Sequence, residues 1–371
     1  MTLRELNILN FKNIREAHLS FSPKLNCLIG NNGMGKTNVL DAIYYLSFCK
    51  SYVSQPDAAV INHDEDFAML QGRYIRRDAQ EDISVSVQRG KRKVVRRGGK
   101  EYQRLSQHIG LLPVVMISPM DWDLIRGAGD ERRKLMDQII SQNNKEYLNA
   151  LIRYAKCIEQ RNSMIRNDLR DPILYETVEQ QACTAASFIS SERERWITEF
   201  TPVFMRYYNA VAGEGEQVSL RYNSHLLHDS MQDLLEKNRQ RDFAVGYTTH
   251  GVHRDDIDLL LHGHSMRKTG SQGQCTTYPI ALRVAQFEFI KNGNATTPIL
   301  LLDDVFDRLD SSRVENIIHI VASNKFGQIF ITDTNRSHID RIVRDMDSDF
   351  RMFAVKDGEC NIIDTANSSI S

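Results

Sequence analysis

Hydrophobic and polar positions alternate in two short segments near the N-terminus, Leu6–Phe11 and His18–Phe21. A period of two is typical of a strand with one buried face. A short apolar run, Leu25–Ile29, then leads into a glycine-rich turn. Beyond the turn, apolar residues recur at helical spacing, at Val39, Leu40, Ile43, Tyr44 and Leu46. The pattern predicts strands around one loop that opens a buried helix.

The pattern changes twice more along the chain. Four strand-favouring segments follow the helix, at Ala68–Tyr74, Ile83–Val87, Lys93–Arg96 and Pro113–Ile117. From about 130 to 241, glycine and proline are rare and charged, helix-favouring stretches dominate. After 243, strands are predicted again, at Ile257–Leu261, Pro298–Leu302 and Gln328–Thr332, with helices between them.

These changes predict an α/β head of mixed sheet and helices that is interrupted by an α-helical lobe. A chain of 371 residues favours two lobes over one core. We place the head at 1–125 and 243–371 and the helical arm at 126–242. The arm lacks sustained heptads, so a compact helical lobe is expected, without a long coiled coil.

The glycine-rich turn has the G-x-x-x-x-G-K-[ST] pattern of a phosphate-binding loop, or Walker A motif. It lies after a strand and before a helix, as that motif requires, and reads Gly30, Asn31, Asn32, Gly33, Met34, Gly35, Lys36 and Thr37. Glycines allow successive backbone N–H groups to face a phosphate, and the helix N-terminus favours an anion. Lys36 is expected to reach the β- and γ-phosphates of ATP, and Thr37 to ligate Mg²⁺.

A second motif ends the predicted strand Pro298–Leu302, where two carboxylates, Asp303 and Asp304, follow an apolar run. This is a Walker B arrangement. Asp303 is expected to hold the Mg²⁺, and Asp304 to orient or deprotonate the attacking water. An acidic loop after a core strand is common, but pairing with a Walker A motif favours the nucleotide site.

A third motif, Ser271-Gln272-Gly273-Gln274, lies about one helix before the Walker B strand. It has the Ser-x-Gly-Gln form of the ABC-type signature loop, in which Ser271, Gly273 and Gln274 would bind the γ-phosphate of ATP held by a second subunit. Because Pro279 fits only the first turn of a helix, we expect the following helix to begin late, with Thr276 as its N-cap. No Q-loop glutamine is evident near Ser118, and Thr332-Asp333-Thr334 has no histidine where transporters carry one.

With these motifs in place, the chain resembles the RecF family over nearly its whole length. The opening Asn10-Phe11-Lys12-Asn13 and the Walker A helix are similar to that family. So is the double aspartate of the Walker B motif. Two further segments are more distinctive because general ABC ATPases lack them: Arg132-Arg133-Lys134-Leu135-Met136-Asp137 and Gly251-Val252-His253-Arg254-Asp255-Asp256.

The resemblance implies an SMC-like, ABC-type P-loop ATPase head with a short arm and a homodimer that closes on ATP and Mg²⁺. It also implies a weak, DNA-stimulated ATPase that acts as a switch in replication and recombinational repair. The implied partners are duplex DNA, gapped DNA or single/double-strand junctions, together with RecR and RecO.

Composition limits how such a protein could contact DNA. The net charge is −1, so any contact must come from a local patch. One basic cluster lies within a predicted hairpin, and its candidate DNA-binding residues are Arg89, Lys91, Arg92, Lys93, Arg96 and Arg97. Such a face would bind phosphates without reading sequence, although a solvated charged hairpin has the same composition.

The six cysteines are scattered without a CxxC pair, no apolar run approaches a membrane span, and no secretory signal is evident, so a cytoplasmic protein is expected. Three other interpretations fit less well. A transporter nucleotidase would carry Asp-Glu and a switch histidine. An ATP-dependent nuclease would add a carboxylate-rich Toprim domain. A metal cluster at His250, His253, Asp255 and Asp256 is disfavoured against ion pairs of Arg254 with the two aspartates.

Overall fold

A computed structural model describes residues 1–53, 56–213, 215–306, 309–323, 326–334, 336–346 and 349–363. The chain forms two compact units, Met1–Asp121 with Gln286–Ser371, and Trp122–Ala285. The expected mixed-sheet head of ABC type is confirmed. The domain division predicted from the sequence assigns 243–285 to the head, whereas these residues lie in the second compact unit; the predicted division stays a prediction.

The first unit contains two six-stranded sheets. One is antiparallel with the order β2-β1-β4-β5-β6-β7, and its strands are β1 (Thr2–Phe11), β2 (Ile14–Ser20), β4 (Phe67–Arg76), β5 (Ala79–Gln88), β6 (Val94–Arg97) and β7 (Lys100–Glu101). The other has the order β15-β14-β3-β13-β12-β8, and its strands are β3 (Leu25–Ile29), β8 (Val114–Ile117), β12 (Ile299–Asp303), β13 (Ile329–Asp333), β14 (Phe350–Lys356) and β15 (Glu359–Ile362). All neighbours in this second sheet are parallel except β14 and β15.

Helix α1 (Lys36–Phe48) contacts strands of both sheets. Leu40, Ile43, Tyr45 and Leu46 are all fully buried, which is expected of a helix that packs against two sheets. This unit also contains the helices α10 (Ser311–Ala322) and α11 (Arg336–Met346) and the short 3₁₀ turns η1 (Asp57–Val60) and η2 (Leu105–Gln107). The parallel sheet and α1 therefore place the phosphate-binding loop at the carboxyl ends of the strands.

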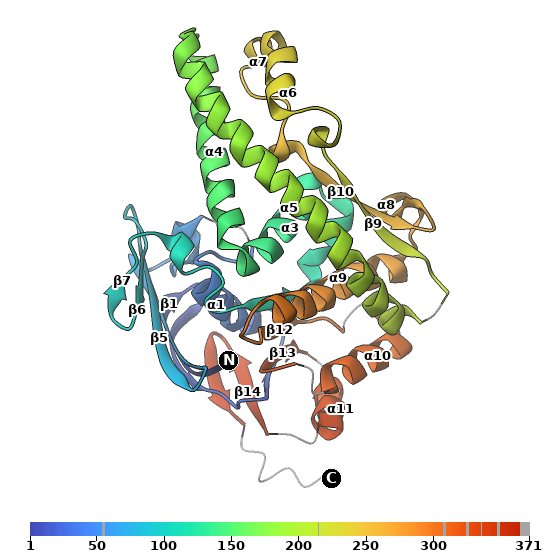
Figure 1. Cartoon of the computed structure of the whole chain (residues 1–371). Helices are drawn as coiled ribbons and strands as arrows, with labels where there is room; N and C mark the ends of the chain where they lie inside the picture. The colour runs from blue at the N-terminus through green and yellow to red at the C-terminus, as the bar shows by residue number, and fades with distance from the viewer. Residues whose placement is uncertain are drawn as a thin grey trace. The chain divides into compact units, whose positions relative to one another are not determined.

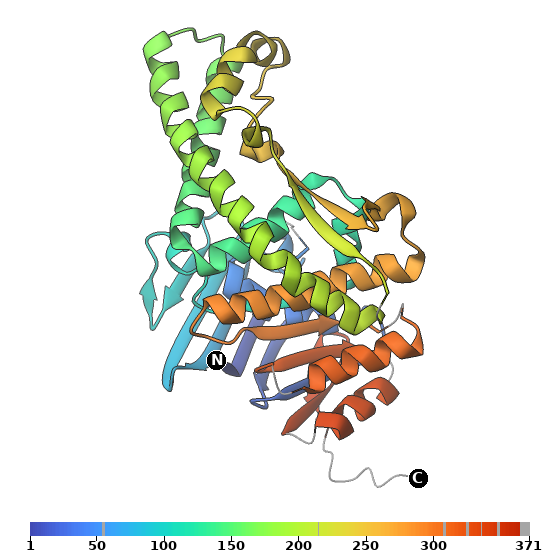
Figure 2. The same ribbon diagram turned by 45° about the vertical axis from the view of Figure 1, so that its right-hand side comes forward.

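The second unit is mainly helical (Figures 1 and 2). Its helices are α2 (Asp123–Arg126), α3 (Gly129–Asn143), α4 (Lys145–Arg166), α5 (Pro172–Ala212), α6 (Met231–Lys237), α7 (Arg239–Val245), α8 (Met266–Thr269) and most of α9 (Gln272–Gly293). A small antiparallel sheet joins β9 (Val218–Asn223), β10 (Asp256–Leu261) and β11 (His264–Ser265). Short 3₁₀ turns are η4 (His225–Leu227) and η5 (Val252–Arg254), while η3 (Pro119–Trp122) spans the unit boundary.

Helices α4 and α5 form an antiparallel hairpin, with α6 and α7 beside its tip (Figure 1). Side chains start both long helices. Asn144 accepts hydrogen bonds from the N–H groups of Glu146 and Tyr147, and Asp171 caps α5 with Pro172 in its first turn. Because α4 has 22 residues, only about half of the 41-residue α5 has this partner. The expected absence of a long coiled coil is confirmed for the part of the chain described here.

Candidate nucleotide-binding site

The phosphate-binding loop joins β3 to α1 through backbone that glycine alone adopts easily. Gly33 and Gly35 have φ of 82° and 113°, in the left-handed region. At Gly30 a Cβ would lie 2.2 Å from the carbonyl oxygen of Val355, so a larger residue does not fit. Asn31, Asn32 and Met34 occupy the intervening positions. The sequence therefore folds locally into a strand, a turn and a helix N-terminus, as predicted.

Lys36 is buried at the start of α1 and points back into this loop. Its Nζ donates hydrogen bonds to the carbonyl oxygens of Gly30, at 2.8 Å, and Asn31, at 3.2 Å. The same nitrogen lies 3.9 Å from Oδ1 of Asp304. The positive charge thus lies between the carbonyl oxygens of the loop and the Asp304 carboxylate that follows the Walker B strand.

Asp303 joins the Walker A and Walker B segments. Its Oδ1 accepts hydrogen bonds from Oγ1 of Thr37, at 2.9 Å, and Oγ1 of Thr332, at 2.8 Å. Burial raises the pKa of Asp303 to about 6, while the two threonine hydroxyls act in the opposite direction. A hydroxyl and a carboxylate in contact beside a phosphate-binding loop form an oxygen donor set of the kind that Mg²⁺ takes. The residues present therefore fit this ion.

Asp304 turns away from the strand that carries Asp303. It has a φ of 45°, and its N–H donates to Oγ1 of Thr332 at 3.0 Å. Thr332 therefore holds both aspartates, one through its hydroxyl proton and the other through its oxygen. Sequence reasoning missed this role, although the position of Thr332 at the end of a strand next to Walker B was a usable signal.

The signature segment begins α9 earlier than expected. The prediction of a late start with Thr276 as N-cap is wrong, because α9 runs from Gln272 with Pro279 inside it. The Ser271 N–H donates to Oε1 of Gln274 at 2.7 Å, and the Gln274 N–H donates to Oγ of Ser271 at 3.3 Å. This reciprocal pair is a capping box, which starts the helix at Gln272 and places Gly273 in its first turn.

Comparison with known proteins then places the whole chain. The family description "RecF/RecN/SMC N terminal domain" matches residues 2–361. A protein of Parabacteroides distasonis named "DNA replication and repair protein RecF" is 50% identical over 359 residues, with 97% of this chain and 98% of the relative covered. A protein of Bacteroides fragilis with the same name is 47% identical, at 97% and 98% coverage. The chain belongs to the RecF family.

Solved structures agree with this assignment. "Structure of the recombination mediator protein RecF-ATP in RecFOR pathway" matches with a TM-score of 0.88 and 25% identity, covering 98% of both chains. An Smc head domain from Pyrococcus furiosus matches in fold, with a TM-score of 0.57 and 16% identity over 98% of this chain and 96% of that one. The SMC-like head expected from the sequence is therefore confirmed. No helix in the described ranges is long and apolar enough to cross a membrane.

The opening segment of this chain, with Lys12 and Asn13, lies against the helix α1 that follows the phosphate-binding loop. Nζ of Lys12 is 2.7 Å from Oδ2 of Asp41, a carboxylate without solvent exposure. Asp41 also accepts hydrogen bonds from the Ser51 hydroxyl and the Tyr52 N–H, each at 2.7 Å. The Asn13 side chain accepts from Nδ2 of Asn38 at 2.7 Å. These bonds fix the helix that carries Lys36 and Thr37.

The two segments expected to be distinctive, Arg132–Asp137 and Gly251–Asp256, meet in the second unit. Asp256 pairs with Arg132 at 2.7 Å, and Asp255 pairs with Arg193 at 2.6 Å. The Arg133 guanidinium donates to the Asp255 carbonyl oxygen at 2.6 Å. The predicted ion pairs involving Arg254 are wrong, because Arg254 lies over the Tyr247 ring and arginines from α3 and α5 reach the two aspartates.

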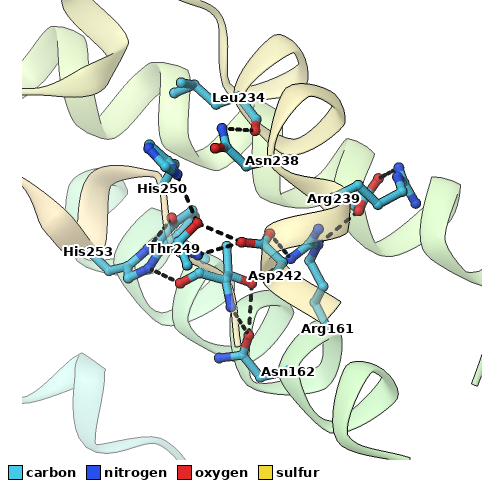
Figure 3. Close-up of polar contacts among 12 residues, drawn as sticks. Arg161, Asn162, Leu234, Asn238, Arg239, Asp242, Thr249, His250 and His253 are labelled. Carbon is cyan, nitrogen blue, oxygen red and sulfur yellow. Dashed lines mark hydrogen bonds and ion pairs between the residues drawn. The ribbon is translucent and has the colours of Figure 1, made fainter. Parts of the chain in front are cut away.

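The nearby histidines have protein partners (Figure 3). His253 donates from Nε2 to the Thr248 carbonyl oxygen at 3.1 Å, because a carbonyl can only accept. Its Nδ1 therefore accepts from the Tyr154 hydroxyl at 2.7 Å. Burial lowers the pKa of His253 to about 4. His250 contacts the Thr249 hydroxyl at 2.9 Å. No group of three or more His, Cys, Asp or Glu that could hold a metal occurs in the described segments.

The six cations predicted to bind DNA fall into two groups, those with protein partners and those that are exposed. Nζ of Lys93 donates to Oδ1 of Asp57 at 2.8 Å and to the Cys49 carbonyl oxygen at 2.5 Å, so this amine supports the fold. Arg97 pairs with Glu81 through two bonds. Arg89 donates to the carbonyl oxygens of Glu65 and Asn62. The other three cations, Lys91, Arg92 and Arg96, are exposed.

Proposed function

We propose that this chain is an ATP-gated clamp for DNA that acts in replication and recombinational repair. Two copies would close over ATP and Mg²⁺ on duplex or gapped DNA and hydrolyse the nucleotide slowly. The observation that carries the proposal is the contact of Thr37 with Asp303 at 2.9 Å beside the buried Lys36. Membership of the RecF family supports the DNA-related part.

Each residue of the site has a task in this proposal. The backbone from Gly30 to Gly35 would bind phosphate oxygens, and Lys36 would exchange its carbonyl partners for the β- and γ-phosphates. Thr37 and Asp303 would hold Mg²⁺, which supplies charge neutralisation at the phosphates. Asp304 would orient the attacking water.

The signature residues would act on the other copy. The first N–H groups of a helix have no partner within the helix, so the Gly273 N–H and the Ser271 hydroxyl can serve as donors to a phosphate. Dimerisation would then depend on the triphosphate, because each signature needs a γ-phosphate to bind. DNA would favour closure and so stimulate a weak ATPase.

The proposed contact with DNA uses the exposed part of the basic hairpin. Lys91, Arg92 and Arg96 offer charge without a base-reading element, which favours structure-selective binding. A solved relative is titled as a recombination mediator in the RecFOR pathway. We extend that to RecR and RecO as partners of this chain.

The dimer is tested by light scattering or sedimentation with ATP, ADP and no nucleotide, on gapped and intact duplex. We expect the wild type to dimerise with ATP and DNA. Lys36→Ala should weaken ATP binding about 100-fold, and Ser271→Arg should keep ATP binding but prevent dimerisation. Normal ATP-dependent dimerisation of Ser271→Arg would refute the role of the signature, and a wild type that stays monomeric with ATP, Mg²⁺ and gapped DNA would refute the clamp.

A further inference from the structure

The signature segment is connected by side chains to the last turns of the long helix α5. Glu216 lies between α5 and β9, and its Oε1 accepts a hydrogen bond from Nε2 of Gln274 at 2.8 Å. Its other oxygen accepts a short hydrogen bond from the Tyr208 hydroxyl. Tyr208 belongs to α5, and Gln274 belongs to the capping box of α9. One carboxylate therefore joins the two helices.

The charge of Glu216 decides how the Gln274 amide is turned. A carboxylate accepts hydrogen bonds and cannot donate them, so only the NH₂ group of Gln274 can face it. The amide oxygen of Gln274 must then face the Ser271 N–H, where the 2.7 Å bond is found. In this way Glu216, which does not itself belong to the signature, fixes the conformation of Ser271.

An aromatic cluster holds the same two helices together. The Tyr278 ring of α9 lies 4.7 Å from Phe204 and 5.6 Å from Tyr208, centroid to centroid. All three rings are fully buried. The Tyr278 hydroxyl donates to the Ser219 carbonyl oxygen at 2.9 Å and accepts from the Leu260 N–H at 3.2 Å. The first two turns of α9 are thereby fixed against α5 and the small sheet.

Pro279 makes these side-chain contacts more important. It lies inside α9 and has no N–H, so the Cys275 carbonyl oxygen lacks the usual bond from four residues further on. The turns before Pro279 are thus less firmly tied to the rest of the helix. Their orientation depends on Gln274, Tyr278 and the partners of those two residues.

We propose that Glu216 is a positioning residue for the signature loop, and that it transmits the position of α5 to Ser271. Its effect on nucleotide binding between two copies rests on the function proposed above. Its effect on the loop itself does not, and the two can be measured separately.

The loop is tested by hydrogen–deuterium exchange of a peptide spanning residues 270–276 in the nucleotide-free, full-length protein. Glu216→Ala should speed exchange about ten-fold, as expected for losing a hydrogen bond to a charged group. Glu216→Gln should have a smaller effect in the same direction, and it keeps the test valid if the alanine variant misfolds. Glu194→Gln, an exposed change on α5, is the control and should stay within about two-fold.

A charge swap tests the pairing directly. Gln274→Glu places two carboxylates against each other and should speed exchange at least as much as Glu216→Ala. The double variant Glu216→Gln with Gln274→Glu restores every donor and acceptor, because glutamate also serves as the last residue of a capping box. Its exchange should return to near the wild-type rate. Exchange as fast as that of Gln274→Glu alone would overturn the proposal.

The functional step is read from dimerisation with ATP. Glu216→Ala should need about ten-fold more protein to dimerise, in proportion to the disorder of its loop. Faster exchange with unchanged dimerisation would overturn the link to nucleotide. Unchanged exchange in Glu216→Ala would overturn the positioning role itself. Faster exchange in a protein whose wild type never dimerises would leave the positioning role standing and reject only the clamp.

Discussion

Buried charged residues have different partners in the candidate nucleotide site and in the second unit. In the candidate nucleotide site, Lys36 and Asp303 are buried, and their hydrogen-bond partners are neutral carbonyls and hydroxyls, although the Asp304 carboxylate lies 3.9 Å from the Lys36 amine. In the second unit, Arg161 and Arg193 are 0% and 2% exposed, and carboxylates bind both of them. The candidate nucleotide site thus holds its charged groups mainly through hydrogen bonds to neutral groups, while the buried arginines of the second unit are held directly by carboxylates.

The network around Arg161 shows the second case in detail (Figure 3). The guanidinium binds Glu179 at 2.8 Å, Asp242 at 2.7 Å and the Thr248 hydroxyl at 2.8 Å. Asp242 in turn accepts from the N–H and hydroxyl of Thr249. These bonds join α4, α5, α7 and the segment before η5. Breaking one pair should leave a buried charge uncompensated.

Arg193→Met should therefore give the largest effect. It removes the partner of Asp255, a side chain with no exposed surface, along with bonds to Asp137 and Tyr147. We expect a loss of about 3–5 kcal/mol in the free energy of unfolding, measured with urea. Arg195→Met, two residues along the same helix, is the control. Its side chain is 61% exposed, so about 0.5 kcal/mol or less is expected. Equal losses in both variants would remove the contrast between the units.

Asp303→Asn, in the candidate nucleotide site, should instead increase the free energy of unfolding. Since the pKa of Asp303 is raised to about 6 in the folded protein, the native state binds a proton more tightly than the unfolded chain. The contribution of this group to stability is present below about pH 4 and is lost as pH rises through 6. The neutral asparagine avoids that loss. We expect the variant to be about 2–3 kcal/mol more stable than the wild type at pH 8, with a chelator present.

The same comparison at about pH 3 is the control, because Asp303 is then largely protonated in both states and the two proteins should differ little. ATP binding with Mg²⁺ should be weakened in the variant at every pH. A variant less stable than the wild type at pH 8 would mean that the carboxylate serves the fold, as those of the arm do.

Substitutions in the basic hairpin should give the smallest effects. They compare a cation that supports the fold with exposed cations that are available to DNA. Lys93→Ala should cost about 1–2 kcal/mol of stability, because the Cys49 carbonyl and Asp57 each lose the hydrogen bond from this amine and Asp57 keeps that from the Tyr45 hydroxyl. Arg92→Ala and Arg96→Ala should leave stability within about 0.5 kcal/mol. Each should lower the slope of log affinity for duplex against log salt by about one. Unaltered slopes would reject this face as the DNA contact.

Local motifs could be predicted from the sequence because their residues are close in the chain. The phosphate-binding loop needs only the strand before it and the helix after it, so Gly30 to Thr37 were found together. Walker B followed from an apolar run ending in two carboxylates. The helical arm followed from composition, since 130–241 contains few helix-breaking residues.

Partners distant in the chain could not be predicted. Arg132 and Asp256 lie 124 residues apart, and neither local sequence indicates that the other residue is its partner. Asp255 was assigned to the neighbouring Arg254, but a buried carboxylate takes whichever cation the fold brings to it, here Arg193. Arg92 and Lys93 are adjacent cations that the sequence does not distinguish. Only the fold shows that Lys93 pairs with Asp57, from a different segment, and so supports the structure.

The start of α9 was predicted wrongly for a different reason, because the local sequence did contain the residues that determine it. Ser271 and Gln274 have the spacing of a capping box, and this outweighed the unfavourable Pro279. A proline costs a helix one bond and some bending, while a reciprocal cap stabilises the helix start with two. A capping box can therefore set the start of a helix even when a proline lies within its first turns.

Strand β14 has a consequence for how the protein is made. It lies beside β3, where its Val355 carbonyl adjoins Gly30, and the following Gly358 N–H donates to the Met34 carbonyl oxygen at 2.9 Å. These neighbours are synthesised more than 300 residues after the phosphate-binding loop. A nascent chain on the ribosome would therefore carry the phosphate-binding loop without these two backbone neighbours until β14 had emerged and paired with β3.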